Sequence, residues 1–193
     1  VAKEVTLVPV RVLDCGGFGQ MSGVVAGLDW VAARHQAGRP AVANLSLSGP
    51  RNSSLDAAVA RVVADGVTVA VAAGNDAGNA CNFSPARAPA ALTAGATDRA
   101  DRRASFSNTG SCVDIFAPGV DVVSDWPGGS TETLSGTSMA SPHVAGVAAL
   151  LLGAHPSWQP AAVAAEIVRL STKNVVTAPG TGSPNRLLYS PPA

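Results

Sequence analysis

Residues 54–75 read "SLDAAVARVVADGVTVAVAAGN", a helical pattern followed directly by a buried strand. Ser54 is expected to cap the helix, because its hydroxyl can accept a hydrogen bond from an unpaired backbone N–H, and Gly66 suits the turn after the helix. Residues 67–73 are almost continuously apolar, which is typical of a parallel strand covered by helices on both faces. The stretch therefore predicts the helix and second strand of a βαβ unit.

The same alternation extends along the rest of the chain. Strands are expected in residues 5–13 ("VTLVPVRVL"), 41–47 and 88–97, and short strands and turns in residues 112–126 and 130–136. Further helices are expected in residues 22–38, from about 138 onward, and 159–172. This order predicts an α/β fold with a mostly parallel sheet. No linker or repeat divides the chain, so one domain is expected over residues 1–193.

Composition excludes several classes of partner. Of the 193 residues, 47% are apolar, enough for a substantial core. Thirteen basic residues balance thirteen acidic ones without a Lys/Arg run, so neither nucleic acid nor a membrane is an expected partner. The longest apolar run, near residues 144–152, is too short to cross a bilayer.

The three cysteines, Cys15, Cys81 and Cys112, lack the spacing of a zinc site. Two interpretations remain open from spacing alone. Cys81 and Cys112 could close a disulfide and leave Cys15 unpaired, or all three could be buried thiols.

Residues 134–150, "LSGTSMASPHVAGVAAL", place Ser138 before an apolar segment. Without a polar stripe this helix is expected to be buried nearly all round, with Pro142 in its first turn. Ser138 is either a helix cap or a nucleophile at the positive end of the helix dipole.

A nucleophilic serine needs a base. His143 follows Ser138 by five residues, so it points elsewhere on the helix and is expected to be a packed, hydrogen-bonded core histidine. His35 and His155 have no context that marks a base.

Asn75 lies just past the carboxyl end of the predicted strand, where α/β sheets present functional groups. Its amide could donate to a developing oxyanion, or it could stabilise a turn.

The segments "GTSMASPHVAG" and "VAVAAGN" resemble those of subtilisin-like serine peptidases, in particular the proteinase K group. "FSPARAP", "RASFSNTGSCVDIFAPG" and "SPNRLLYS" match in the expected order, so the resemblance covers essentially the whole chain. It implies a subtilisin-like three-layer sandwich and a secreted, monomeric endopeptidase that cleaves protein or peptide substrates through a serine acyl-enzyme. No catalytic cofactor is implied. An α/β-hydrolase is disfavoured, because "GTSMA" lacks the second glycine of G-x-S-x-G.

The resemblance also implies roles for individual residues. Ser138 would be the nucleophile, Asn75 would form the oxyanion hole with the Ser138 N–H, and Thr137 would support it. Met21 would line a subsite further upstream in the substrate. The residues expected to hold the substrate as an added strand are Gly17, Phe18 and Gly19 on one side and Leu47, Ser48 and Gly49 on the other. The pocket for the residue before the scissile bond would be lined by Ala72, Ala73 and Gly74, which favours apolar or aromatic side chains.

Two structural features follow from the same resemblance. A calcium ion is expected at the Asp114 carboxylate and the carbonyls of Pro89 and Ala91, since calcium prefers oxygen ligands. The resemblance also favours the Cys81–Cys112 disulfide.

The family's Asp-Ser/Thr-Gly and His-Gly-Thr segments are absent, and Asp14 and His35 match neither. The N-terminal part of the domain, which would also hold the partner of Cys15, is therefore expected upstream of Val1. The chain alone should be inactive, with an open strand edge. The alternative is a pseudoenzyme that keeps the cleft as a peptide-binding or interaction module.

Overall fold

The computed structural model describes residues 1–190 and is built on a six-stranded sheet. Five neighbouring strands run parallel, and β9 alone is antiparallel. Along the sheet, the order is β1 (Val42–Leu45), β3 (Thr68–Ala72), β5 (Leu92–Thr97), β6 (Ile115–Pro118), β10 (Arg186–Leu187) and β9 (Thr172–Lys173). Two small antiparallel pairs join β2 (Gly49–Pro50) to β4 (Phe83–Ser84) and β7 (Val122–Trp126) to β8 (Ser130–Leu134).

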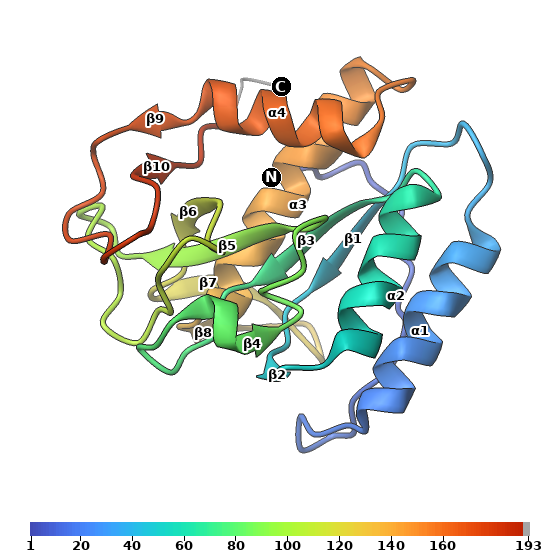
Figure 1. Cartoon of the computed structure of the whole chain (residues 1–193), viewed down its shortest axis with the longest axis horizontal. Helices are drawn as coiled ribbons and strands as arrows, with labels where there is room; N and C mark the ends of the chain where they lie inside the picture. Colours follow the sequence, from blue (N-terminus) through green and yellow to red (C-terminus); the bar gives the residue numbers. More distant parts are fainter. Residues whose placement is uncertain (191–193) are drawn as a thin grey trace.

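Helices cover both faces of the sheet (Figure 1). The helices of the described residues are α1 (Met21–Arg34), α2 (Ser53–Ala64), the short 3₁₀ helix η1 (Ala80–Asn82), α3 (Thr137–Ala154) and α4 (Pro160–Leu170). Strand β3 shows why three layers form. Val69 and Val71 pack with α1 and α2, whereas Ala70 between them packs with α3 and α4. This confirms the expected α/β sandwich with a mostly parallel sheet.

Helix α3 crosses β1, β3, β5 and β6 and forms the centre of one layer. Its length and apolar composition would also suffice to span a membrane, but here it is a core helix that buries Val144, Val147 and Ala148. The expectation of burial all round was wrong, because Pro142 and Gly153 are exposed and several other positions are half-buried. These positions face away from the sheet, where Val1 packs against Gly146.

The strand expected in residues 5–13 does not form. A strand needs a paired neighbour, and β1, at the end of the sheet, pairs only with β3. The segment instead packs through Val10 and Val12 against Gly27 of α1, leaving Leu7 84% exposed.

The cap of α2 also differs from the expectation. Asn52, with extended backbone angles, accepts a hydrogen bond from the Leu55 N–H at 2.9 Å, so the helix begins at Ser53 and Ser54 lies within it. The expected turn after the helix is present, since Gly66 has a φ of +107°.

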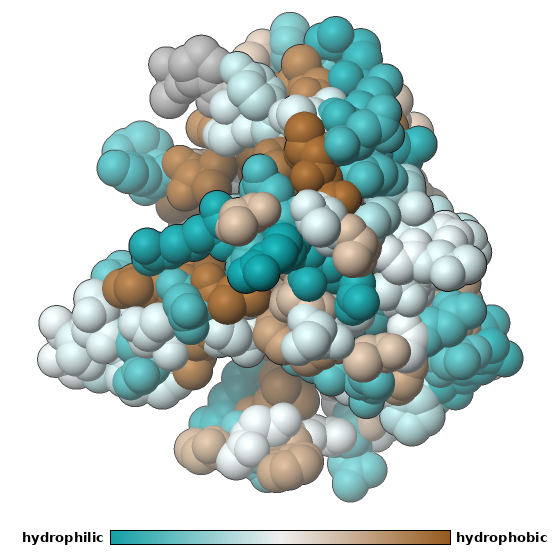
Figure 2. Space-filling model, turned by 90° about the vertical axis from the view of Figure 1, so that its left-hand side faces the viewer, coloured by the Kyte–Doolittle hydropathy of each residue, from teal (hydrophilic) through white to brown (hydrophobic). Residues whose placement is uncertain are grey.

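Apolar side chains are exposed in several places, and most of the larger ones lie near the N-terminus and on the β7–β8 hairpin. They include Val5, Leu7, Val8 and Phe18, and on the hairpin Val123, Trp126 and Leu134. Apolar patches also lie between hydrophilic ones on the face that carries β9 and β10 (Figure 2), where Val175 and Tyr189 are exposed.

Candidate active site

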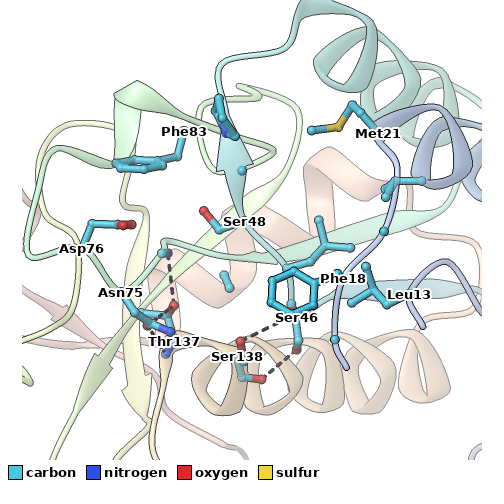
Figure 3. A pocket seen from close by; sticks show the side chains of 18 residues that line it. Leu13, Phe18, Met21, Ser46, Ser48, Asn75, Asp76, Phe83, Thr137 and Ser138 are labelled. Carbon is cyan, nitrogen blue, oxygen red and sulfur yellow. Dashed lines mark hydrogen bonds between the residues drawn. The ribbon is translucent and has the colours of Figure 1, made fainter. Parts of the chain in front are cut away.

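Ser138 is the second residue of α3, close to the positive end of the helix dipole. Its hydroxyl donates to the backbone carbonyl of Ser46 at 3.2 Å (Figure 3). Ser46 follows β1, so the candidate nucleophile lies at the carboxyl edge of the parallel sheet, where α/β folds place their binding sites.

A second contact between Ser46 and Ser138 compensates for a proline in α3. Pro142 is the sixth helical residue, beyond the first turn in which it was expected, and it has no N–H for the Ser138 carbonyl four residues earlier. The Ser46 hydroxyl donates to this carbonyl at 2.7 Å instead. Ser46 therefore ties the end of β1 to the helix turn that carries Ser138.

Asn75 is oriented by Thr137, in the arrangement drawn in Figure 3. Its Oδ1 accepts hydrogen bonds from the Thr137 N–H at 2.9 Å and from the Thr137 hydroxyl at 2.8 Å. The same hydroxyl accepts from the Gly74 N–H at 3.1 Å. These contacts to Oδ1 fix the orientation of the amide, and no hydrogen bond from Asn75 Nδ2 is found within residues 1–190.

Two donors converge in front of Gly136. A Cβ built on Gly136 would lie 3.4 Å from Asn75 Nδ2 and 3.6 Å from the Ser138 backbone nitrogen. The missing side chain of Gly136 thus leaves a space close to both nitrogens and to Met139 Sδ, which would lie 3.6 Å from the same Cβ. This arrangement suits an oxyanion beside Ser138.

The cleft next to Ser138 has a volume of about 700 Å³. Ala73, which was expected to line it, does not do so and is fully buried. Among the lining residues are the other expected ones, Gly17, Phe18, Gly19, Met21, Leu47, Ser48, Gly49, Ala72, Gly74, Asn75, Thr137 and Ser138.

Sequence reasoning missed Ser46, Asp76 and Phe83, which also line the cleft. The motif around Asn75 could have pointed to its neighbour Asp76. Ser46 directly follows β1 and Phe83 belongs to β4, and no spacing relates them to Ser138. Asp76 is the one charged side chain of the lining, and the described residues give it no ion-pair partner.

Comparisons with known proteins agree with this geometry. The model of the subtilase family matches residues 1–187. The chain belongs to the subtilase family. An extracellular serine proteinase of Thermus sp. is 55% identical over 193 residues, which are 99% of this chain and 47% of the relative. Alkaline serine exoprotease A of Vibrio alginolyticus is 54% identical over 98% of the chain and 35% of its own length. The crystal structure of a cold-adapted subtilisin-like serine proteinase has a TM-score of 0.96 and 47% identity, covering 100% of this chain and 69% of that one. This subtilase chain thus spans about half the length or less of these two relatives.

The three histidines of this subtilase chain are all engaged away from Ser138. His143 Nδ1 contacts the Met139 carbonyl of its own helix at 2.8 Å and is half-buried. His35 bridges Asp65 and the Arg39 carbonyl, and His155 stacks on Trp158 at the far end of α3. The described residues therefore provide Ser138 with no histidine base.

The expected calcium ligands Pro89, Ala91 and Asp114 line a second cavity of about 380 Å³. Burial raises the pKa of the Asp114 carboxyl, although a 2.8 Å hydrogen bond from the Thr93 N–H and the charge of Arg186 oppose this shift. A cation beside the carboxylate would offset the cost of its burial. No group of three or more His, Cys, Asp or Glu side chains that could hold a metal occurs among the described residues. A site here would therefore rest on a single carboxylate and backbone oxygens, a donor set that calcium accepts.

The structure contains the Cys81–Cys112 disulfide, with a Cα–Cα distance of 5.3 Å. Cys15 is a free, exposed thiol. The alternative of three buried thiols is therefore wrong.

Proposed function

We propose that this chain carries the nucleophile and oxyanion hole of a secreted, monomeric serine endopeptidase, whose catalytic Asp and His come from sequence preceding Val1. The observation that carries the proposal is that the Asn75 Nδ2 and the Ser138 backbone nitrogen both lie within 3.6 Å of one point, the position of a Cβ built on Gly136, next to the residue that carries the Ser138 hydroxyl. The names of two relatives, an extracellular serine proteinase and an alkaline serine exoprotease, support the assignment to secreted serine peptidases. In this proposal residues 1–193 are the larger part of one catalytic domain.

In the proposed reaction, the Ser138 Oγ attacks the carbonyl carbon of the scissile peptide bond. The upstream histidine removes the hydroxyl proton. The carbonyl oxygen becomes an oxyanion held by the Ser138 N–H and Asn75 Nδ2. When the C–N bond breaks, the histidine returns the proton to the leaving amine, and the acyl group stays on Ser138. Water then attacks the acyl carbon while the histidine takes its proton. The ester bond to the Ser138 Oγ breaks, the histidine returns the proton to this oxygen, and the carboxylic acid product leaves.

Thr137 is proposed to act indirectly. By occupying the Asn75 Oδ1 with its N–H and hydroxyl, it leaves only the amide nitrogen facing the reacting carbonyl. Such prior orientation means that little reorganisation is needed when charge develops.

The cleft is proposed to bind substrate as an extra strand between residues 17–19 and 47–49. Small walls at Ala72 and Gly74 and the ring of Phe83 suit an apolar or aromatic side chain before the scissile bond. The carboxylate of Asp76 would repel an acidic side chain there. Met21 would contribute to a subsite further upstream.

Hydrolysis of peptide substrates by the protein expressed together with its upstream sequence tests the proposal. Ser138→Ala should abolish turnover, and Asn75→Ala should lower kcat about 100- to 1,000-fold, the usual effect of losing one oxyanion donor. Peptides with Phe before the scissile bond should be cleaved faster than peptides with Glu. Hydrolysis that survives Ser138→Ala would refute the assignment of the nucleophile.

The second candidate function is a pseudoenzyme that binds peptides without cleaving them. The absence of a histidine base near Ser138 in the described residues favours it. The DNA preceding Val1 discriminates between the two, since an open reading frame with Asp-Ser/Thr-Gly and His-Gly-Thr segments supports the enzyme. A start codon and signal peptide directly before Val1 would support the binding module.

Calcium is proposed to bind at Asp114 with the Pro89 and Ala91 carbonyls as a structural ion. At neutral pH calcium should raise the melting temperature of the wild type and have a much smaller effect on Asp114→Asn. In a chelator, Asp114→Asn should be at least as stable as the wild type, because the amide can still accept from the Thr93 N–H without a buried charge. Equal calcium responses of the two proteins in thermal unfolding would remove Asp114 from the site.

A further inference from the structure

We propose that Asn108 is a positioning residue for the candidate oxyanion hole, acting through the segment Ala73–Gly78 that carries Asn75. The inference rests on the proposed function of Asn75. Asn108 was part of a matched sequence segment, but neither its neighbours in sequence nor its spacing from Asn75 suggested a role.

The segment Ala73–Gly78 follows β3, and beyond Ala73 it lacks the strand pairing that holds the sheet. Gly74 has a φ of +98°, which favours glycine and turns the chain away from the sheet. The backbone groups around Asn75 must therefore find partners other than a neighbouring strand.

Asn108 supplies several of these partners, three of them from its buried side chain, while Thr137, Phe106 and Thr109 supply others. Its Oδ1 accepts from the Asp76 N–H at 3.0 Å and the Gly78 N–H at 2.8 Å. Its Nδ2 donates to the Ala73 carbonyl at 2.9 Å and faces the Asp76 carboxylate at 3.4 Å. Its backbone N–H donates to the Gly74 carbonyl at 3.0 Å. These contacts lie on both sides of Asn75 in sequence, so they fix the residue from both ends.

Asn108 is itself held rigidly. It is fully buried, as is Ser107 beside it. The Ser107 hydroxyl donates to the Asn108 carbonyl at 3.1 Å and accepts from the Ala96 N–H of β5 at 3.0 Å. Hydrogen bonds through Ser107 and Asn108 thus connect the segment that carries Asn75 to strand β5 of the central sheet.

The geometry leaves little room for adjustment. A Cβ on Gly74 would lie only 2.4 Å from the Asn108 Nδ2. Loss of the Asn108 amide would free this space and leave two backbone N–H groups and one carbonyl without their partner. Asn75 would retain its contacts to Thr137, and the backbone contacts of Gly74 and Ala77 would remain, but the segment would lose its side-chain anchor at Ala73, Asp76 and Gly78. Misplacement of a catalytic donor by about 1 Å can cost about 100-fold in rate.

Two variants of the protein expressed with its upstream sequence test this role. Asn108→Ala should lower kcat about 10- to 100-fold while KM changes less than about threefold, because the oxyanion contact acts mainly in the transition state. Asn108→Asp keeps the acceptor but places a carboxylate against the Ala73 carbonyl and Asp76. Its kcat should fall further below that of the wild type as pH rises, since only the protonated acid can donate to the Ala73 carbonyl.

Thr93→Val is the matched control. It removes a buried 2.8 Å hydrogen bond to the Ala86 carbonyl without touching the segment Ala73–Gly78. This variant should lose stability and retain the kcat and KM of the wild type. Wild-type kcat in both Asn108 variants would overturn the inference.

A readout without activity separates this inference from the proposed function. In Asn108→Ala, the amides of Asp76 and Gly78 should exchange with solvent at least about tenfold faster than in the wild type, while the core amides of β5 do not. Unchanged exchange at both amides would also overturn the inference. An absence of Ser138-dependent hydrolysis in the wild type would refute the proposed function alone.

Discussion

Gly136 shows how one missing side chain shapes the candidate site. Its backbone is extended, with φ 163° and ψ 160°, so any residue could adopt this conformation. A Cβ would also fit, but it would occupy the space next to Asn75 Nδ2 and the Ser138 backbone nitrogen in which the oxyanion is proposed to bind. We therefore expect that glycine is needed here for binding of the oxyanion and not for the backbone conformation.

In the protein expressed with its upstream sequence, Gly136→Ala should therefore lower activity strongly without unfolding the domain. The methyl group would occupy the proposed oxyanion position at ordinary contact distances of 3.4 and 3.6 Å from the two donors. We expect kcat to fall about 100- to 1,000-fold, as for loss of an oxyanion donor. Chemical denaturation should show a change in unfolding free energy within about 0.5 kcal/mol, typical of a substitution without strain or clash.

Gly153→Ala provides the comparison, because its Cβ would meet no atom within 4 Å and it lies in the last turn of the same helix. It should leave kcat unchanged and increase stability by up to about 1 kcal/mol, the difference in helix propensity. A Gly136→Ala protein with wild-type kcat would show that the oxyanion does not bind in front of Gly136.

Ser138 and Asn75 could be identified from sequence because each lies in a distinctive local motif. Ser46 and Asn108 could not, since their roles depend on contacts across 92 and about 30 residues of sequence. Each is a polar residue that completes the hydrogen bonding of a distant backbone. Such a role leaves no local pattern.

At the scale of elements, His35 joins the end of α1 to the end of α2. Its side chain is only 6% exposed, and its two ring nitrogens contact acceptors, Asp65 Oδ2 at 2.8 Å and the Arg39 carbonyl at 2.8 Å. Burial by itself would lower the pKa of His35, but the hydrogen bond to Arg39 and the bond and charge of Asp65 outweigh it and raise the pKa above 6.5. Only the imidazolium can donate to both partners.

The contact of His35 with Asp65, which links α1 to α2, should therefore weaken as the pH rises above neutral. Because the folded pKa of His35 is raised, its contribution to stability is complete below 6.5 and is lost as pH rises through the folded pKa. Denaturation from pH 6 to 9 should show a decline in unfolding free energy that is absent in His35→Gln. The same decline in the variant would assign the effect to another group.

The elements predicted best from the sequence are a helix, whose backbone hydrogen bonds lie within the element, and a strand with a paired neighbour on each side. Helix α2 and strand β3 appear where the pattern predicted them, apart from the cap at Asn52. Residues 5–13 have the composition of a strand but remain unpaired, because a strand depends on its neighbour. The half-buried face of α3 could not be predicted for a similar reason, because the burial of a helix face depends on which other elements pack against it.

At the scale of the whole molecule, the cleft lacks a histidine base within the described residues, and apolar surface near the N-terminus is exposed. The cleft, the oxyanion donors and the nucleophile lie together at one edge of the sheet, but all three histidines are engaged elsewhere. The sheet ends at β1, and large apolar side chains near the N-terminus are exposed. Under the proposed function, the sequence preceding Val1 would supply the catalytic Asp and His and cover these surfaces.

The rate at which a fluorophosphonate labels Ser138 measures this dependence most directly. We predict that the chain alone reacts no faster than its Ser138→Ala variant, since a serine without a base is a poor nucleophile. The protein with its upstream sequence should be labelled rapidly and only at Ser138. Rapid labelling of Ser138 in the chain alone would contradict the account, because it would show that residues 1–193 already contain the activating base.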